Sequence, residues 1–116
     1  MVQVDECGNI TVTRGDTLDV PVMAYTDDTR SEVYRLAEGE KFRFRLRTFE
    51  GGEIARENYI EMQAEDGSFM ISLSAAQTAE LINYAYIFDL ALISADGTEQ
   101  YTFFGGEEIK KTLRVV

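Results

Sequence analysis

The sequence predicts an all-β fold: an immunoglobulin-like β-sandwich of about eight short strands, with one short crossover helix near residues 75–83. Two observations predict it. Short apolar runs recur at near-regular spacing, several of them alternating with polar residues, and turn pairs that contain glycine separate them. The chain has 116 residues, the length of one domain, which we place at residues 1–116.

The first strands are short. Residues 9–13 alternate β-branched apolar and polar side chains and predict a strand, which Arg14-Gly15-Asp16 ends with a turn. Residues 17–23 predict a second strand. Proline cannot donate to a ladder, so this strand should lie at a sheet edge or keep Pro21 on its unpaired side. The polar residues 26–31 predict a turn.

The clearest alternation lies in residues 41–48, after a possible short strand at residues 33–36. Its apolar side chains face one way and its basic side chains the other: Phe42, Phe44 and Leu46 against Lys41, Arg43, Arg45 and Arg47. Residues 50–53 read Glu-Gly-Gly-Glu and predict a hairpin turn. The pattern weakens in residues 54–65, where residues 59–62 are the candidate strand.

The second half of the chain is organised around one long strand. Ser74 and Gln77 have the spacing of a capping box for a helix over residues 75–83, with Asn83 as its stop. Residues 84–94 have the highest apolar density of the chain. They predict a mid-sheet strand with both faces at least partly covered.

Asp-Gly turns join the remaining strands. Asp66-Gly67 precedes a strand over residues 69–73, and Asp96-Gly97 joins the central strand to residues 98–104. Gly105-Gly106 interrupts the chain before a last strand at residues 110–116. The predicted core consists of Val20, Val22, Phe42, Phe44, Leu46, Phe69, Ile71, Leu73, Leu81, Tyr86, Phe88, Leu90, Leu92 and Leu113.

Composition narrows the classes of function. The net charge is −10 and there is no histidine. This charge argues against nucleic acid as a partner, because a phosphate backbone requires clustered Lys and Arg. No stretch approaches the roughly 20 apolar residues of a membrane span, so we expect no membrane partner. The N-terminus lacks a signal-peptide pattern and Cys7 is the single cysteine, which together predict a cytoplasmic protein.

We predict that the protein is not an enzyme and holds no cofactor. Without histidine there is no ordinary Ser–His or Cys–His nucleophile pair. Cys7 lies in an acidic N-terminus that we expect to be frayed, where neighbouring carboxylates disfavour a reactive thiolate. The glycine pairs lack the Lys-Ser/Thr and the helix of a phosphate loop. No catalytic, cofactor-binding or metal-binding residue is predicted.

Two motifs are better explained by turns than by ligands. Arg14-Gly15-Asp16 matches the integrin-adhesion motif by letters, but a turn between two strands uses the same residues. The Asp-Gly pairs at residues 66–67 and 96–97 suit turns, whereas calcium needs about six to eight converging oxygens. Asp27-Asp28 lacks such companions.

The basic row formed by Lys41, Arg43, Arg45 and Arg47 is the candidate protein-interaction face. The favoured interpretation is a solvated sheet face, paired with cross-strand carboxylates such as Glu57 or Glu61. The alternative is a face that docks onto an acidic partner, or onto a second copy that displays Glu61, Glu65 and Asp66. In that case, charge reversal at Arg43 and Arg45 should abolish association and leave the fold intact.

Several short sequence segments occur in an order typical of a known family. Residues 10–17 read as a strand with a Gly-Asp-Thr turn, and residues 34–44 place Gly-Glu before Phe-Arg-Phe. Residues 73–92 combine a Thr-containing helical turn with Tyr-x-Phe-Asp-Leu, and residues 96–98 and 111–115 follow. Together they resemble the small N-terminal β-sandwich domain of phage and prophage baseplate and tail-fibre proteins, an upper-baseplate-protein-like family. That family more often has Gly-Asp where this chain has Gly39-Glu40.

The resemblance implies a structural or assembly protein of a phage or prophage virion, of the tail or baseplate type. Such a protein acts through protein–protein contacts with other virion or assembly proteins, or with its own copies. It would be made in the cytoplasm of the bacterial host and could enter the virion. The family's domain usually precedes a longer protein, so a chain ending at Val116 implies a stand-alone assembly protein or a looser relationship. The resemblance carries over no site residue.

An immunoglobulin-like module that binds carbohydrate or peptide is the alternative function. Immunoglobulin-like domains share the Thr-Ala…Tyr phrase before their penultimate strand. Carbohydrate-binding modules usually present exposed aromatic side chains, and the candidates are Tyr25, Tyr34, Tyr59 and Tyr101. If these tyrosines are buried, this alternative loses its support in the sequence.

Overall fold

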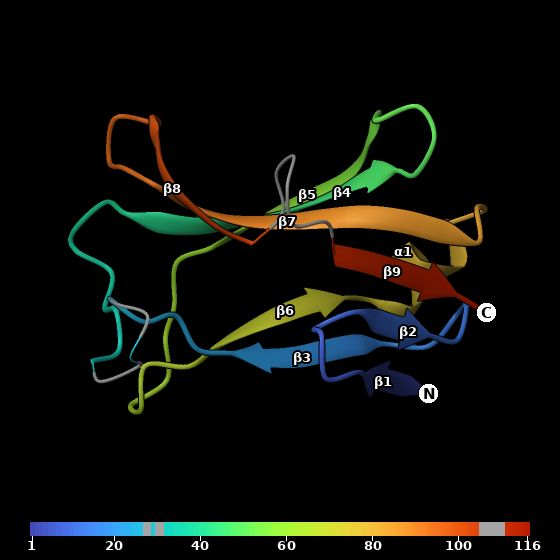
Figure 1. The fold of residues 1–116 in the computed structure, drawn as a ribbon, viewed down its shortest axis with the longest axis horizontal. Helices are drawn as coiled ribbons and strands as arrows, with labels where there is room; N and C mark the ends of the chain where they lie inside the picture. The colour runs from blue at the N-terminus through green and yellow to red at the C-terminus, as the bar shows by residue number, and fades with distance from the viewer. Residues whose placement is uncertain (27–28, 30–31, 105–110) are drawn as a thin grey trace.

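Strand β7 (Ala85–Ile93) lies at the centre of the larger of two sheets (Figure 1). One edge pairs antiparallel with β4 (Lys41–Thr48), and β9 (Lys111–Val115) and β8 (Glu99–Phe104) share the other. The even-numbered residues of β7 face the core, and Ala91 and Ile93 are buried as well. The predicted mid-sheet position, with both faces partly covered, is confirmed.

The structure is a computed structural model that describes residues 1–26, 29, 32–104 and 111–116. The predicted features at Asp27-Asp28 and Gly105-Gly106 lie outside these residues. Within them, seven strands form the larger sheet, in the order β1-β2-β9-β7-β4-β5 with β8 beside β7, and β3 pairs with β6 in a second sheet. The remaining elements are β1 (Val2–Val4), β2 (Ile10–Val12), β3 (Leu18–Val22), β5 (Ile54–Ile60), β6 (Phe69–Leu73) and α1 (Ala75–Ala79).

The two sheets form a sandwich, which confirms the predicted all-β fold. Figure 1 shows β3 and β6 as a layer beneath β4 and β7. Phe42 of β4 and Phe69 of β6 stack between the layers, with ring centroids 4.0 Å apart and an interplanar angle of 12°. A two-stranded layer packed on a sheet with β9-β7-β4-β5 order matches the immunoglobulin-like layout. Among the described residues, β3 pairs with β6 alone, so Pro21 lies in an edge strand as expected.

The predicted core is buried, with the exception of Val22, which is half-buried. Apolar residues that were not on the predicted list are also buried: Ile10, Val12, Leu18, Ala24, Ala91, Ile93 and Val115. Those of β2, β3 and β9 belong to the same core cluster, whereas Ala91 and Ile93 of β7 do not. The short N-terminal strands therefore contribute more to the core than their sequence pattern indicated.

The capping box of α1 is confirmed. The Ser74 hydroxyl accepts from the Gln77 backbone N–H at 3.1 Å, and the Gln77 side-chain oxygen accepts from the Ser74 backbone N–H at 2.9 Å. The helix ends at a C-cap on Glu80, earlier than the predicted stop at Asn83. The next N–H groups leave the helical ladder: Leu81 N–H donates to Thr78 O at 3.1 Å, and Asn83 N–H donates to the Tyr86 hydroxyl at 3.1 Å.

Two strand predictions were wrong in extent, and the expected fraying of the N-terminus was wrong. Residues 33–36 form only an isolated bridge between Val33 and Tyr25, because the Leu36 N–H donates to the Gln63 side chain rather than to a strand. The N-terminus is not frayed, since β1 pairs with β2. Strand β5 spans Ile54–Ile60 instead of residues 59–62, because β4 provides a ladder along that whole segment.

The predicted turn at residues 26–31 lies largely outside the described residues, whereas those at Gly15, Asp66-Gly67 and Asp96-Gly97 are present. Gly15 lies between β2 and β3 with φ of 87°, and Asp16 N–H donates to Thr13 O at 2.9 Å, as a turn requires. Asp96-Gly97 closes the β7–β8 hairpin. Asp66-Gly67 is a turn but joins strands of different sheets, so it is not a hairpin. Among the described residues no helix is long and apolar enough to cross a membrane.

Candidate functional site

The basic row lies on the outer face of β4, and we name Lys41, Arg43, Arg45 and Arg47 the arginine face. The alternation that puts phenylalanine and leucine into the core directs these four side chains outward. They are not equally exposed. The side chains of Arg43 and Arg45 are 11% and 17% exposed, whereas Arg47 is 34% exposed. The arginine face is therefore only partly accessible to a partner.

Asp89 of β7 explains how three guanidinium groups pack together. It lies opposite Arg45, with Arg45 Nε 3.5 Å from Asp89 Oδ2, and it is 14% exposed. Arg43 Nη2 lies 4.0 Å from Asp89 Oδ1, and Arg47 Nε lies 3.9 Å from Oδ2. One carboxylate is thus the shared ion-pair partner of three arginines. The register between β4 and β7 places Asp89 opposite Arg45 and so within reach of Arg43 and Arg47.

Further carboxylates surround this cluster. Arg43 Nη2 lies 3.5 Å from Glu99 Oε2 on β8, and Arg45 Nη1 lies 3.9 Å from Glu57 Oε2 on β5. The expected cross-strand partner Glu57 is confirmed, but Asp89 and Glu99 pair with the row where Glu61 was expected. Four buried atoms of the cluster have no hydrogen-bond partner among the described residues: Arg43 Nε and Nη2, Arg45 Nε and Asp89 Oδ1.

This pairing changes what charge reversal would do. Glutamate at positions 43 and 45 would add two carboxylates beside Asp89 and remove two of its three counter-charges. We therefore expect the double reversal to destabilise the fold, although both side chains point away from the core. Docking at the arginine face stays a prediction, and Arg47 is the most exposed of its three arginines.

The candidate tyrosines do not form one ligand surface. Tyr25 and Tyr34 are half-buried, and Tyr34 donates to Glu40 Oε1 at 2.7 Å. Tyr59 is 49% exposed, but Lys41 lies over its ring at 4.6 Å and its hydroxyl donates to Glu57 at 2.8 Å. That hydrogen bond raises the pKa of Tyr59. The side chain of Tyr101 lies outside the part of the chain that the structure describes.

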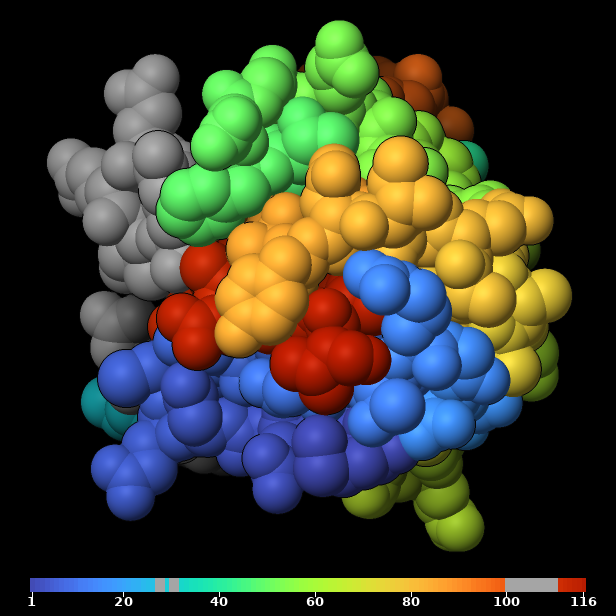
Figure 2. Space-filling model, turned by 90° about the vertical axis from the view of Figure 1, so that its right-hand side faces the viewer, coloured from blue at the N-terminus to red at the C-terminus, as the bar shows by residue number. Residues whose placement is uncertain are grey.

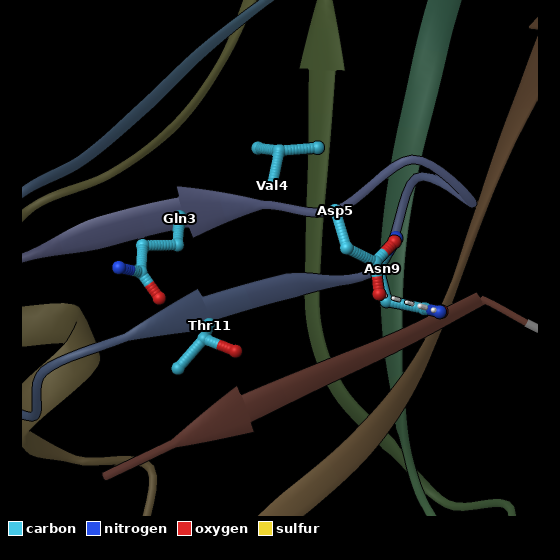
Figure 3. A pocket seen from close by; sticks show the side chains of 5 residues that line it. All are labelled: Gln3, Val4, Asp5, Asn9 and Thr11. Atoms are coloured by element: carbon cyan, nitrogen blue, oxygen red, sulfur yellow. Dashed lines mark hydrogen bonds between the residues drawn. The ribbon is translucent and has the colours of Figure 1, made fainter.

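A hollow of about 410 Å³ lies beside the β1–β2 turn, lined by Gln3, Val4, Asp5, Asn9 and Thr11. Figure 3 shows Asp5 and Asn9 directed toward each other at that turn. The Asp5 carboxylate accepts from the backbone N–H groups of Cys7 and Asn9, both at 2.9 Å. The Asn9 N–H lowers the pKa of Asp5. These contacts stabilise the turn, so we assign the polar groups here to structure.

A second hollow, which we name the end cleft, lies between the β4–β5 hairpin and the segment before β7. It has a volume of about 550 Å³ and is lined by Thr48, Phe49, Glu50, Gly51, Glu53, Asn83, Tyr84 and Ala85. Figure 2 shows the end of the sandwich where the hairpin (green) and this segment (orange) lie near the C-terminal strand (red). Of its lining residues, Phe49 and Tyr84 are 55% and 60% exposed.

Hydrogen bonds hold the hairpin wall of the end cleft in place. Thr48 N–H donates to Glu53 O at 2.8 Å, and Gly52 N–H donates to Thr48 O at 3.1 Å. Arg47 Nη1 donates to Gly52 O at 3.0 Å, so a residue of the arginine face is hydrogen-bonded to the β4–β5 hairpin. The wall is therefore formed before any partner binds.

Hydrogen bonds also fix the opposite wall of the end cleft, which consists of the segment before β7. Arg14 Nε donates to Leu81 O, Asn83 N–H donates to the Tyr86 hydroxyl at 3.1 Å, and Val115 N–H donates to Tyr84 O at 2.8 Å. A pre-formed cleft loses little conformational entropy on binding. The end cleft thus combines exposed apolar surface with fixed geometry, the combination expected of a contact site.

No family model matches the chain, and no curated protein matches it at significant similarity. Function is therefore argued from the fold and its surface. The sequence prediction missed the end cleft, because its two walls are far apart in the chain. The available signal was the position of Phe49 and Tyr84, two aromatic residues that lie just outside strands rather than within them.

Proposed function

We propose that this β-sandwich is a structural or assembly protein of a phage or prophage virion, of the tail or baseplate type, and that it acts through protein–protein contacts. The observation that carries the proposal is the pair of exposed aromatic side chains in the end cleft, Phe49 and Tyr84, on hydrogen-bonded walls. Exposed apolar side chains gathered in a cleft are typical of interaction sites. The β-sandwich fold and the order of the sequence phrases support the virion assignment.

The test is association with particles in the host. A tagged copy of the chain is expressed in its bacterium, phage production is induced, and particles and assembly intermediates are separated on a density gradient. We expect the chain in the fractions that contain tail or baseplate proteins. If it stays in particle-free fractions throughout the lytic cycle, the proposal is wrong.

A second candidate function is carbohydrate binding at the same cleft. Aromatic rings beside Glu50, Glu53 and Asn83 offer stacking surfaces together with hydrogen-bonding groups, as a sugar ligand requires. A glycan array probed with the purified protein separates the two functions. Selective binding of a glycan that is lost in Tyr84→Ala would favour the carbohydrate-binding module over the virion protein.

A further inference from the structure

The end cleft carries two acidic side chains, Glu50 and Glu53. Glu50 and Glu53 are exposed, and among the described residues neither carboxylate forms an ion pair. In the part of the chain that the structure describes, the nearest guanidinium groups do not pair with these carboxylates: Arg47 Nε lies 3.9 Å from Asp89 Oδ2, and Arg14 donates to the carbonyls of Leu81 and Asn83. Arg114 lies opposite Ala85 on β9 but lines a separate small pocket. The cleft therefore presents aromatic rings and free carboxylates side by side.

We propose that the end cleft binds a basic, extended segment of a partner protein, an inference that rests on the proposed function. A lysine or arginine side chain can lay its aliphatic stem and its cation over an aromatic ring. At Phe49 and Tyr84 its charged head would come close to Glu50 and Glu53. The cleft therefore provides both an aromatic surface for the aliphatic stem and carboxylates for the cation.

The charge of the whole chain selects this occupant over a second copy. At −10, two copies repel each other, whereas a basic segment is attracted from a distance. The pre-formed walls favour an extended segment that enters the cleft without rearranging it. An acidic segment would face Glu50 and Glu53 without counter-charges, so it would bind poorly.

The test is a titration of isotope-labelled protein followed by amide chemical shifts. The probe is a short synthetic peptide of alternating arginine and serine, and its counterpart carries glutamate in place of arginine. We expect shifts confined to residues 48–53 and 82–85 with the arginine peptide only. Tyr84→Ala, or Glu50→Gln with Glu53→Gln, should weaken binding by about tenfold, because each removes one half of the contact.

Glu61→Gln with Glu65→Gln is the matched control, since it changes the net charge equally at exposed positions outside the cleft. It should bind the arginine peptide within about twofold of wild type, because salt screens distant charges. Unchanged shifts elsewhere show that each variant is folded. The inference is overturned if the control weakens binding as much as the cleft variant. It is also overturned if a neutral oligosaccharide, or dilution of the protein alone, shifts the same residues.

Particle association separates this inference from the proposed function. If Glu50→Gln with Glu53→Gln associates with particles as wild type does, the cleft is not the contact and the inference fails, while the virion role stands. If the arginine peptide binds the cleft but wild type never associates with particles, the virion role fails and the basic-segment inference stands.

Discussion

Arg45 and Asp89 lie opposite each other on β4 and β7, with Arg45 Nε 3.5 Å from Asp89 Oδ2. Their side chains are 17% and 14% exposed, so the pair is largely removed from water. The same carboxylate lies within 4.0 Å of Arg43 and 3.9 Å of Arg47. Most of the charge on the arginine face is therefore balanced within the chain, which is why we place the principal contact at the end cleft.

Asp89→Asn should lower the free energy of unfolding by about 3 kcal/mol, because it leaves three guanidinium groups without their shared counter-charge. Urea unfolding monitored by circular dichroism measures the change. Glu61→Gln, at an exposed position, is the control and should change stability by less than about 0.5 kcal/mol. Equal stability of wild type and Asp89→Asn would mean that the cluster contributes nothing.

Phe88→Ala should cost about 3–5 kcal/mol, and Phe44→Ala a similar amount, as large-to-small core changes do. The two rings pack with centroids 5.5 Å apart and are 2% and 0% exposed. Phe49→Ala, at a ring that is 55% exposed, is the matched control and should stay within about 0.5 kcal/mol of wild type. Chemical denaturation of the three variants decides the point, and equal losses at Phe49 and Phe88 would contradict the core assignment.

Thr78→Val should cost about 1–3 kcal/mol, although the two side chains have the same shape. The buried Thr78 hydroxyl donates to Asp16 O at 2.7 Å and accepts from Gly15 N–H at 3.1 Å, which fixes the β2–β3 turn on α1. Thr78→Ser keeps the hydroxyl and should retain most of the stability. Thermal unfolding of both variants is the measurement. A serine variant less stable than the valine variant would show that the methyl group, rather than the hydroxyl, matters.

Tyr34 should make stability depend on pH in the alkaline range. Burial, followed by the hydrogen bond to Glu40, raises the pKa of Tyr34 from 10.0 to about 12. The folded state favours the neutral phenol, so its contribution is complete below pH 10 and is lost as the pH rises from about 10 through about 12. The stability advantage of wild type over Tyr34→Phe should shrink across that range. A difference that stays constant from pH 9 to about 12 would contradict the assignment.

Local patterns predicted the elements whose own residues determine them. The alternation of Phe42, Phe44 and Leu46 specifies β4, and Ser74 with Gln77 specifies the start of α1. Strand β5 was only partly predicted, because residues 55–58 read Ala-Arg-Glu-Asn and have no apolar alternation. Pairing with β4 makes this segment a strand, and a local pattern does not contain that information.

The candidate site depended even more on long-range pairing. The arginine row was visible in the sequence, but its main partner Asp89 belongs to a strand that meets β4 only through the sheet register. The end cleft joins residues 48–53 to residues 83–85 in the same way. Its aromatic residues, Phe49 and Tyr84, lie at strand ends, where exposure is decided by the packing of neighbouring loops rather than by periodicity.

The central claim, that the protein acts through a contact at the end cleft, is tested most directly by particle association of Phe49→Ala with Tyr84→Ala. Its control is Met62→Ala with Met70→Ala, which also removes exposed apolar side chains but outside the cleft. On a density gradient after phage induction, wild type and control should migrate with tail or baseplate proteins, and the cleft variant should stay in the particle-free fractions. Migration of the folded cleft variant with the particles, at the wild-type level, would contradict the account.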